Sequence, residues 1–307
     1  MVLAGTLADV DMLSRSFGPS AYLAWNRTFF HSVLAALLLG LLAALPFLFI
    51  KTVAPENRAR ALSVFVPAVA SALLHVLLDL CDFQGVVLGW PVSSRRFALD
   101  WLPTFNLSIP GLLLAALFLP KLASLVSEEI GARSKGPRGR GAAIATLVLL
   151  AAYVGARGLL HANAVATLDA RTYGGESARR VAAIPTSWPL TWTGVVETER
   201  ALREPIVSTA PGSVFDPELA RASYKPDPSP ALDAALKTVT ARRFIAATRF
   251  PKASLEKTQD GYRISIRAFP YDADLEYGRR VQAIIDVDAA GKILSETLAW
   301  DPASHQP

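Results

Sequence analysis

Two side chains that can bind a metal ion lie one helical turn apart in an apolar stretch of the sequence. His75 and Asp79 are separated by four positions, so on a helix they lie one above the other on the same face. An imidazole nitrogen and a carboxylate oxygen placed in this way suit zinc or a similar divalent metal. The same spacing serves equally well for a hydrogen bond between two membrane helices, which is the alternative.

More ionisable residues precede the first long apolar run. Asp9 and Asp11 are separated by one residue, and Arg27 and His31 follow shortly before the run begins. Taken singly, the two aspartates could simply solvate an exposed segment, and Arg27 could contact lipid headgroups. Ionisable groups at the edge of an apolar helix are nevertheless unfavourable by on the order of a few kcal/mol, so they are candidates for a functional role.

The elements that must position these residues are long apolar helices. Hydrophobic residues make up 52% of the 307-residue chain, which exceeds what soluble globular chains carry. Crossing a hydrocarbon core takes roughly 20 helical residues. Runs of about this length occupy 33–50, 61–80, 107–126 and 142–160. The sequence therefore predicts about four transmembrane helices in residues 1–160.

Basic residues between the predicted spans indicate the orientation of the chain. They follow the first span and the third span, at Lys51, Arg58, Arg60, Arg133, Lys135, Arg138 and Arg140. Such loops face the cytoplasm, which places the amino-terminal segment, residues 81–106 and everything after residue 160 outside. The start of the first span and the end of the second then share the outer face. Asp9, Asp11, Arg27, His31, His75 and Asp79 collect there, together with Arg95 and Arg96.

The second half has a different pattern. From residue 161 onward no run is long enough to span a bilayer, and residues 262–268 alternate between apolar and polar types, as in a half-buried strand. Residues 281–288 and 292–300 flank a short Ala-Ala-Gly turn and predict a hairpin. One helix is expected over 230–248, capped by Ser229. The predicted fold is an α-helical membrane domain followed by a soluble, α+β, mainly antiparallel β, extracytoplasmic domain over 161–307.

Composition also excludes several kinds of site. Cys81 is the only cysteine, which excludes an internal disulfide and a cysteine-based zinc site. The second half contains no nucleophile elbow, phosphate loop or metal-ligand spacing. The net charge of +5 follows largely from the basic cytoplasmic loops, so we expect no nucleic-acid partner.

The order of these motifs resembles the YdjM-type family of inner-membrane, metal-dependent hydrolases. The resemblance is carried by the Asp-x-Asp element in 7–13, by Asn-Arg-Thr-Phe-Phe-His-Ser at 26–32, and by His-Val-Leu-Leu-Asp at 75–79. Gly85, Trp-Pro-Val-Ser at 90–93 and Arg95-Arg96 follow in the same order. Residues 192–198 and 249–251 also look similar to the family, so the resemblance extends over nearly the whole chain.

The resemblance implies a metal site and a location. The implied ligands are Asp9, Asp11, His31, His75 and Asp79, with Arg27 nearby, and the implied location is a bacterial inner membrane. The sequence departs from the family pattern at Asn26, where the family usually has histidine, and at Asn106, where an aspartate often stands. Thr28 and Phe30 replace the family's glycine and threonine.

The sequence therefore predicts a membrane-embedded hydrolase that uses a divalent metal, most simply zinc, on an ester or phosphoester at the outer face of the membrane. Arg27, and less favourably Arg95 or Arg96, would neutralise an anionic substrate or transition state. A position at the bilayer surface favours a small or lipid-like substrate. The alternative is a non-catalytic membrane protein whose outer domain binds an envelope partner. A transporter is disfavoured because polar residues at one face give no continuous path.

Overall fold

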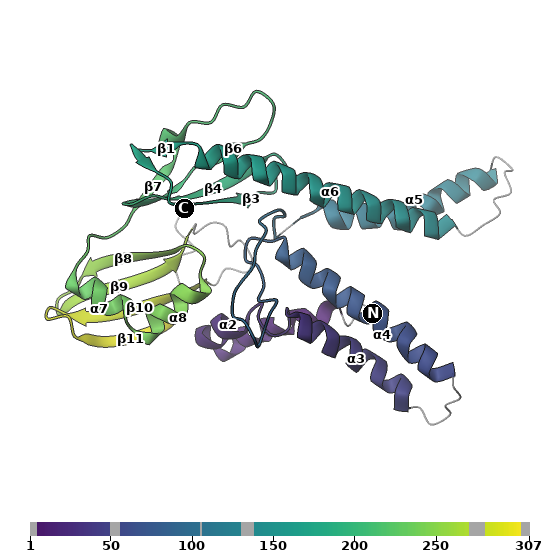
Figure 1. The fold of residues 1–307 in the computed structure, drawn as a ribbon, viewed down its shortest axis with the longest axis horizontal. Coiled ribbons are helices and arrows are strands. Elements are labelled where there is room, and N and C mark those ends of the chain that lie inside the picture. Colours follow the sequence, from purple (N-terminus) through teal and green to yellow (C-terminus); the bar gives the residue numbers. More distant parts are fainter. Residues whose placement is uncertain (1–4, 50–55, 105, 130–137, 270–279, 302–307) are drawn as a thin grey trace.

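The first half of the chain is helical. The computed structural model describes residues 5–49, 56–104, 106–129, 138–269 and 280–301. A 3-10 helix and a short α-helix come first and four long helices follow: η1 (Leu7–Phe17), α2 (Pro19–Trp25), α3 (Val33–Phe49), α4 (Glu56–Leu80), α5 (Ser108–Glu129) and α6 (Arg138–Asp169). Helices α3 and α4 pack together as one arm, and α5 and α6 as a second; both arms extend from the β-rich half (Figure 1).

Small side chains allow α3 and α4 to pack closely. Ala36 and Ala72 are buried between these helices, and a Cβ at Gly40 would lie 2.1 Å from Cγ2 of Val69. Small residues at helix contacts are typical of packing in a membrane, where close backbone approach replaces the hydrophobic effect as the source of attraction. This contact fixes the direction of α4, whose last turns carry His75 and Asp79.

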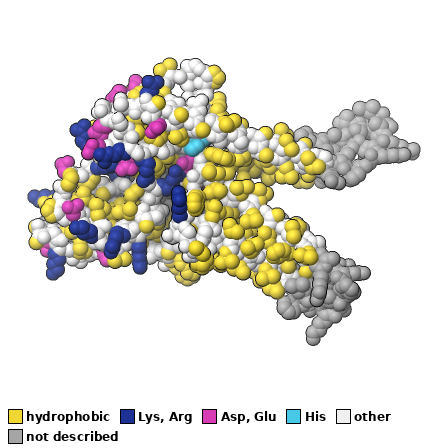
Figure 2. Space-filling view, viewed as in Figure 1, with side chains coloured by type: hydrophobic (Ala, Val, Ile, Leu, Met, Phe, Trp, Pro, Cys, Tyr) yellow, Lys and Arg dark blue, Asp and Glu magenta, His cyan; other side chains and the backbone are white. Residues whose placement is uncertain are grey.

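The outward surfaces of both arms are apolar. Leu38, Leu74, Leu117 and Leu147 are 45–60% exposed, and Figure 2 shows hydrophobic side chains covering the described parts of the arms, while Lys, Arg, Asp and Glu gather on the β-rich half. Helices α4 (over Ala61–Leu80) and α6 (over Gly141–Asp169) are long and apolar enough to cross a membrane. The described apolar stretches of α3 and α5 are shorter, Val33–Leu45 and Ser108–Phe118.

The second half contains two antiparallel sheets. Besides a small two-stranded ribbon of β1 (Thr172–Tyr173) and β2 (Glu176–Ser177), a five-stranded sheet has the order β3-β4-β5-β7, with β6 paired to β4. Its strands are β3 (Arg180–Pro185), β4 (Thr191–Glu197), β5 (Ala201–Glu204), β6 (Ile206–Ser208) and β7 (Arg221–Tyr224), with the 3-10 turn η2 (Pro217–Leu219) before β7. The last turns of α6 pack on this sheet, where Leu168 contacts the core around Trp192. Helix α6 thus joins the two halves directly.

The last sheet is a four-stranded meander covered by two helices. The strands β8 (Pro251–Lys257), β9 (Gly261–Ala268), β10 (Arg280–Asp288) and β11 (Ile293–Asp301) pair in chain order. Helices α7 (Pro230–Leu236) and α8 (Val239–Ala247) pack on one face, where Ala235 and Phe244 meet Ile264 and Ile285. The predicted strand over 262–268 and the hairpin after it are confirmed.

The prediction of one helix over 230–248 was wrong in one respect, because two helices occupy it. Ser229 caps the first helix as expected, accepting a hydrogen bond from the Leu232 backbone N–H. Thr238 then takes an extended backbone conformation, and its hydroxyl accepts a hydrogen bond from the Ala241 N–H. A threonine with this conformation ends one helix and caps the next. Periodicity alone did not reveal the break, since apolar residues continue at helical spacing across it.

Candidate metal centre

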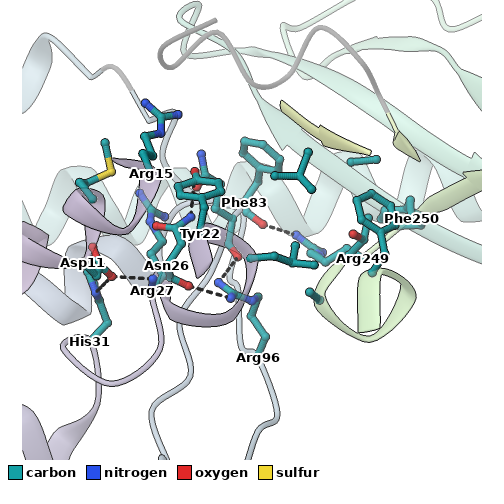
Figure 3. A pocket seen from close by; sticks show the side chains of 18 of the residues that line it. Asp11, Arg15, Tyr22, Asn26, Arg27, His31, Phe83, Arg96, Arg249 and Phe250 are labelled. Atoms are coloured by element: carbon teal, nitrogen blue, oxygen red, sulfur yellow. Dashed lines mark hydrogen bonds and ion pairs between the residues drawn. The ribbon is translucent and has the colours of Figure 1, made fainter. Parts of the chain in front are cut away.

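Three separate segments bring the ionisable residues of the first half together. Asp9 and Asp11 lie on η1, Arg27 and His31 lie in the turns between α2 and α3, and the pair from α4 completes the group. Figure 3 shows Asp11, Arg27 and His31 side by side at one end of a cavity. The backbone of Arg27 is left-handed, with φ of 54°, an uncommon conformation for a residue other than glycine that often marks a functional constraint.

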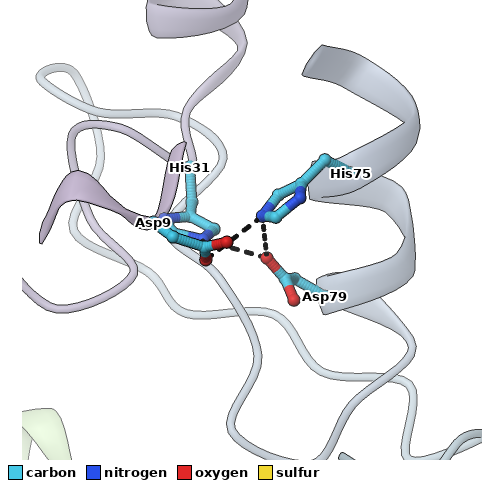
Figure 4. A group of neighbouring side chains, drawn as sticks. All are labelled: Asp9, His31, His75 and Asp79. Carbon is cyan, nitrogen blue, oxygen red and sulfur yellow. Dashed lines mark ion pairs between the residues drawn. The ribbon is translucent and has the colours of Figure 1, made fainter. Parts of the chain in front are cut away.

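Four of the side chains could hold one ion. One donor atom from each of Asp9, His31, His75 and Asp79 lies within 4.8 Å of the others (Figure 4). Nε2 of His75 lies 3.4 Å from Oδ1 of Asp9 and 3.1 Å from Oδ2 of Asp79. Nε2 of His31 lies 2.9 Å from Oδ2 of Asp79 and 3.9 Å from Oδ1 of Asp9. The ligand atoms of a tetrahedral zinc, at about 2.0 Å from the metal, are roughly 3.3 Å apart, so the group has the size of a metal site.

The directions of these atoms also fit an ion. Nε2 of His75 and Oδ2 of Asp79 are buried and lack a hydrogen-bond partner within the described residues, although they lie 3.1 Å apart. Buried polar atoms are normally hydrogen-bonded, so each such atom without a partner requires an explanation. Donor atoms that approach one another without hydrogen-bond angles are expected where both face a common cation. Asp9 is 58% exposed, so the group is open on one side, as catalytic zinc sites are.

Asp11 lies outside this group of four, behind His31. Its Oδ2 is 3.0 Å from Nδ1 of His31, the ring nitrogen that faces away from the group, and both side chains are 1% exposed. Burial alone would lower the pKa of His31, but the carboxylates of Asp11 and Asp79 outweigh it and raise that pKa above its usual value. A carboxylate behind a histidine ligand fixes the ring and increases its basicity. The position of Asp11 therefore suits a residue that orients a ligand.

Arg27 contacts the acidic residues of the site rather than open solvent. Its backbone N–H donates to Oδ2 of Asp11 at 2.6 Å, and its Nη1 donates to Oδ2 of Asp82 at 2.8 Å. Its Nη2 lies 3.6 Å from Oδ1 of Asp79. Thr104 also donates to Asp82, at 2.9 Å. Arg27 thus links the three acidic side chains and holds Asp79 in place.

Sequence reasoning missed Asp82, although its spacing of three from Asp79 places it near that residue at the end of a helix. Burial raises the pKa of the Asp82 carboxyl above its usual value despite the adjacent Arg27 guanidinium. Cys81, next to it, is buried, and burial raises the pKa of its thiol to about 11. A thiol with so high a pKa is protonated at neutral pH and is no candidate nucleophile.

The two neighbouring arginines differ in position. Arg96 lines the cavity together with Asp9 and His31. The exposed Arg95 lies over the ring of Phe97, 5.0 Å from its centroid, and does not line this cavity. Of the predicted substrate-neutralising residues, the structure therefore brings Arg27 and Arg96 to the site and leaves Arg95 at the surface.

The cavity is shared by both halves of the chain. It has a volume of about 450 Å³ and reaches from Asp9 and His31 to Arg249 and Phe250 of the β-rich domain. Arg249 donates from Nη2 to Oδ2 of Asp100 at 2.8 Å and from Nη1 to the carbonyl of Phe83 at 2.9 Å. These contacts of Arg249 hold the β-rich domain against the segment that follows α4.

Comparison with known proteins identifies one family. A family model described as YdjM inner membrane protein matches residues 1–164, just over half of the chain. This matched part contains all four residues of the group and also Asp11, Arg27 and Asp82. No curated protein and no solved structure matches the chain.

The four-residue group predicts bound metal in the purified protein. Elemental analysis of detergent-purified chain is expected to find about one divalent ion, because the four N and O donors lie at the separations of a single metal site. The double variant His75→Ala, Asp79→Ala removes two donors and should lose the ion. The variant His161→Gln alters a histidine outside the group and should keep it. Equal metal content in all three proteins would contradict a metal centre here.

The position of Asp11 behind His31 predicts that its substitution weakens metal binding without abolishing it. In Asp11→Asn the negative charge behind His31 is removed while the four donors remain, so affinity should fall about 10- to 100-fold with unchanged stoichiometry at saturating metal. Competition with a chelating indicator dye measures this affinity. Asp233→Asn, an exposed change on α7, serves as the control. Complete loss of binding in Asp11→Asn would make Asp11 a direct ligand.

Proposed function

Because the chain belongs to the YdjM inner membrane protein family, we propose that it is a membrane-embedded, metal-dependent hydrolase of an ester or phosphoester. The observation that carries the proposal is the convergence of Asp9, His31, His75 and Asp79 from three segments, with one ligand atom from each within 4.8 Å of the others. Polar pairing across helices would need only one partner residue for each of His75 and Asp79. It gives no reason for two imidazoles and two carboxylates to converge on one point.

Zinc is the ion that we propose, since two imidazoles and two carboxylates form a mixed N and O donor set that zinc accepts readily. A bound divalent ion would lower the pKa of a water molecule and polarise the scissile group. Hydrolysis would join the water oxygen to the acyl carbon or phosphorus and break the bond to the leaving oxygen, with one water proton on the leaving alcohol and the other on the released acid.

The chain's own residues would support this reaction by position and charge. Asp11 holds the ring of His31, and Arg27 holds Asp79, so the donors are kept in place before substrate arrives. Asp9 is the most exposed of the four donors and borders the cavity, which places the open side toward a substrate. Arg96, on the same cavity wall, would neutralise negative charge on the substrate or transition state.

We also propose the topology expected from the basic loops: four membrane spans in a bacterial inner membrane, with the metal centre and the β-rich domain outside the cytoplasm. The group includes Asp79 in the last turn of α4, and the cavity that it borders is also lined by residues of the β-rich domain, so a substrate would be reached at the membrane surface. A lipid-like substrate fits this position.

Labelling of single cysteines tests the topology. In a Cys81→Ser background, Val214→Cys, which replaces a 95% exposed outer-domain residue, should react with a membrane-impermeant maleimide in spheroplasts. Ser134→Cys, in the basic stretch between the third and fourth predicted spans, should react only after lysis. The opposite pattern of labelling would place the β-rich domain in the cytoplasm.

Chromogenic esters test the activity. The purified chain with zinc or manganese should release nitrophenol from 4-nitrophenyl acetate, 4-nitrophenyl phosphate or bis(4-nitrophenyl) phosphate. The rate should fall at least about 100-fold in the His75→Ala, Asp79→Ala variant, because activation of the nucleophile is lost. A chelator should have the same effect, reversed by added metal, and His161→Gln should retain the activity. If the double variant loses thermal stability while both proteins lack metal and activity, the non-catalytic alternative is correct.

A further inference from the structure

The cavity next to the metal centre has two chemically distinct ends. Figure 3 shows Asp11 and His31 at one end, Arg249 and Phe250 at the other, and Arg96 between them. Three phenylalanines line the outer-domain part, and they are Phe244, Phe250 and Phe269. A volume of about 450 Å³ is within the range of small-molecule sites. The lining therefore suits a ligand with one polar and one apolar portion.

Arg96, between the two ends, brings to the cavity a positive charge that no carboxylate contacts directly within the described residues. Its guanidinium donates to the backbone carbonyls of Asn26 and Gly85, each at 3.1 Å, and of Gln84 at 3.4 Å. Within the described residues it forms no ion pair with a carboxylate, whereas Arg249 pairs with Asp100. Carbonyl groups orient a guanidinium without neutralising it. Burial lowers the pKa of Arg96 to about 10, so the side chain remains charged at neutral pH.

The loop that carries Arg96 is held in a fixed shape. Val86 and Phe97 pair through two backbone hydrogen bonds of 2.8 and 2.9 Å. Gly85 has φ of +64°, and a Cβ there would lie 2.2 Å from the carbonyl oxygen of Phe97. Only glycine fits this close approach. The loop thus presents Arg96 to the cavity in one arrangement, as expected of a binding residue.

The opposite wall is apolar and comes from the outer domain. Phe250 and Phe269 are 5% and 6% exposed and form one cluster with Ile184, and Phe83 of the first half packs against that cluster. This wall can accept an uncharged portion of a ligand and exclude water from it. Asp9 and His31, next to the arm formed by α3 and α4, line the same cavity.

We infer that the substrate is a phosphorylated amphiphile whose phosphate lies between the metal centre and Arg96, with its uncharged portion against the phenylalanine wall. The inference rests on the proposed hydrolase function and deepens it. A phosphate has enough oxygens to contact a cation and a guanidinium together, which a neutral carboxylic ester lacks. In the reaction, the oxygen of water bonds to phosphorus and the P–O bond to the alcohol portion breaks. One proton of water ends on the alcohol and the other on the released phosphate.

Binding measurements on the metal-loaded full chain in phosphatidylcholine nanodiscs test this inference. The probes are dihexanoyl phosphatidic acid, the uncharged dihexanoylglycerol with the same chains, and glycerol 3-phosphate with the charge alone. We expect phosphatidic acid to bind at least about 10-fold more tightly than either of the others. Arg96→Gln should weaken its binding about 10-fold or more, as expected when charge-assisted hydrogen bonds are lost.

Control variants separate the charge from general damage. Arg179→Gln changes an exposed arginine that pairs with Glu199 and should leave binding unchanged. Arg96→Lys keeps the charge and should bind more tightly than Arg96→Gln. Equal binding of the charged and uncharged amphiphiles, or no effect of Arg96→Gln, would overturn the inference. Equal binding of glycerol 3-phosphate and phosphatidic acid would show that the site recognises the phosphate group alone. It would overturn the inference that the ligand is an amphiphile.

The outcomes also distinguish this inference from the proposed function. Arg96-dependent binding of phosphatidic acid without any turnover would contradict the hydrolase function and support the lipid-binding site. Metal-dependent turnover of the nitrophenyl esters without Arg96-dependent binding of phosphatidic acid would support the hydrolase function and contradict the lipid-binding site.

Discussion

Repulsion between two carboxylates sets the main constraint on the first half of the molecule. Asp9 and Asp79 each approach the same nitrogen of His75, at 3.4 and 3.1 Å, at the end of an apolar helix where charges are poorly screened. Such an arrangement persists only if positive charge offsets it. The four donor atoms lie within 4.8 Å of one another, a separation that suits a divalent cation, so an ion bound there would stabilise the fold of this region.

The surrounding residues keep the donors apart from lipid and in a fixed arrangement. Asp11 contacts the rear nitrogen of His31, and Arg27 joins Asp11, Asp79 and Asp82. The left-handed backbone of Arg27 allows its N–H to contact Asp11 while its guanidinium contacts Asp79 and Asp82. Charges alternate outward from the centre, so each buried group has an opposite charge or a donor next to it, which lowers the unfavourable energy of burying them.

The β-rich domain contributes residues to the same cavity as the first half of the chain. Helix α6 runs from the membrane arm into the five-stranded sheet, and Arg249 fixes the meander to Asp100. These two connections place an apolar wall opposite Arg96. The hydrolase that we propose would need both a charged centre and an apolar site for the rest of its substrate, and different halves of the chain supply a charged group and an apolar wall.

The sequence by itself determined the features that depend on local spacing. The apolar runs, the four-residue interval between His75 and Asp79, the cap at Ser229 and the hairpin of β10 and β11 all follow from periodicity and turn chemistry. It did not distinguish the role of Asp9 from that of Asp11, since both belong to one motif. On a 3-10 helix residues two apart face different directions, so the side chain of Asp9 is largely exposed while that of Asp11 is buried. The partners of Arg27, the importance of Asp82 and the approach of Phe250 to the centre were decided by tertiary packing, because contacts between distant segments depend on how helices and sheets meet.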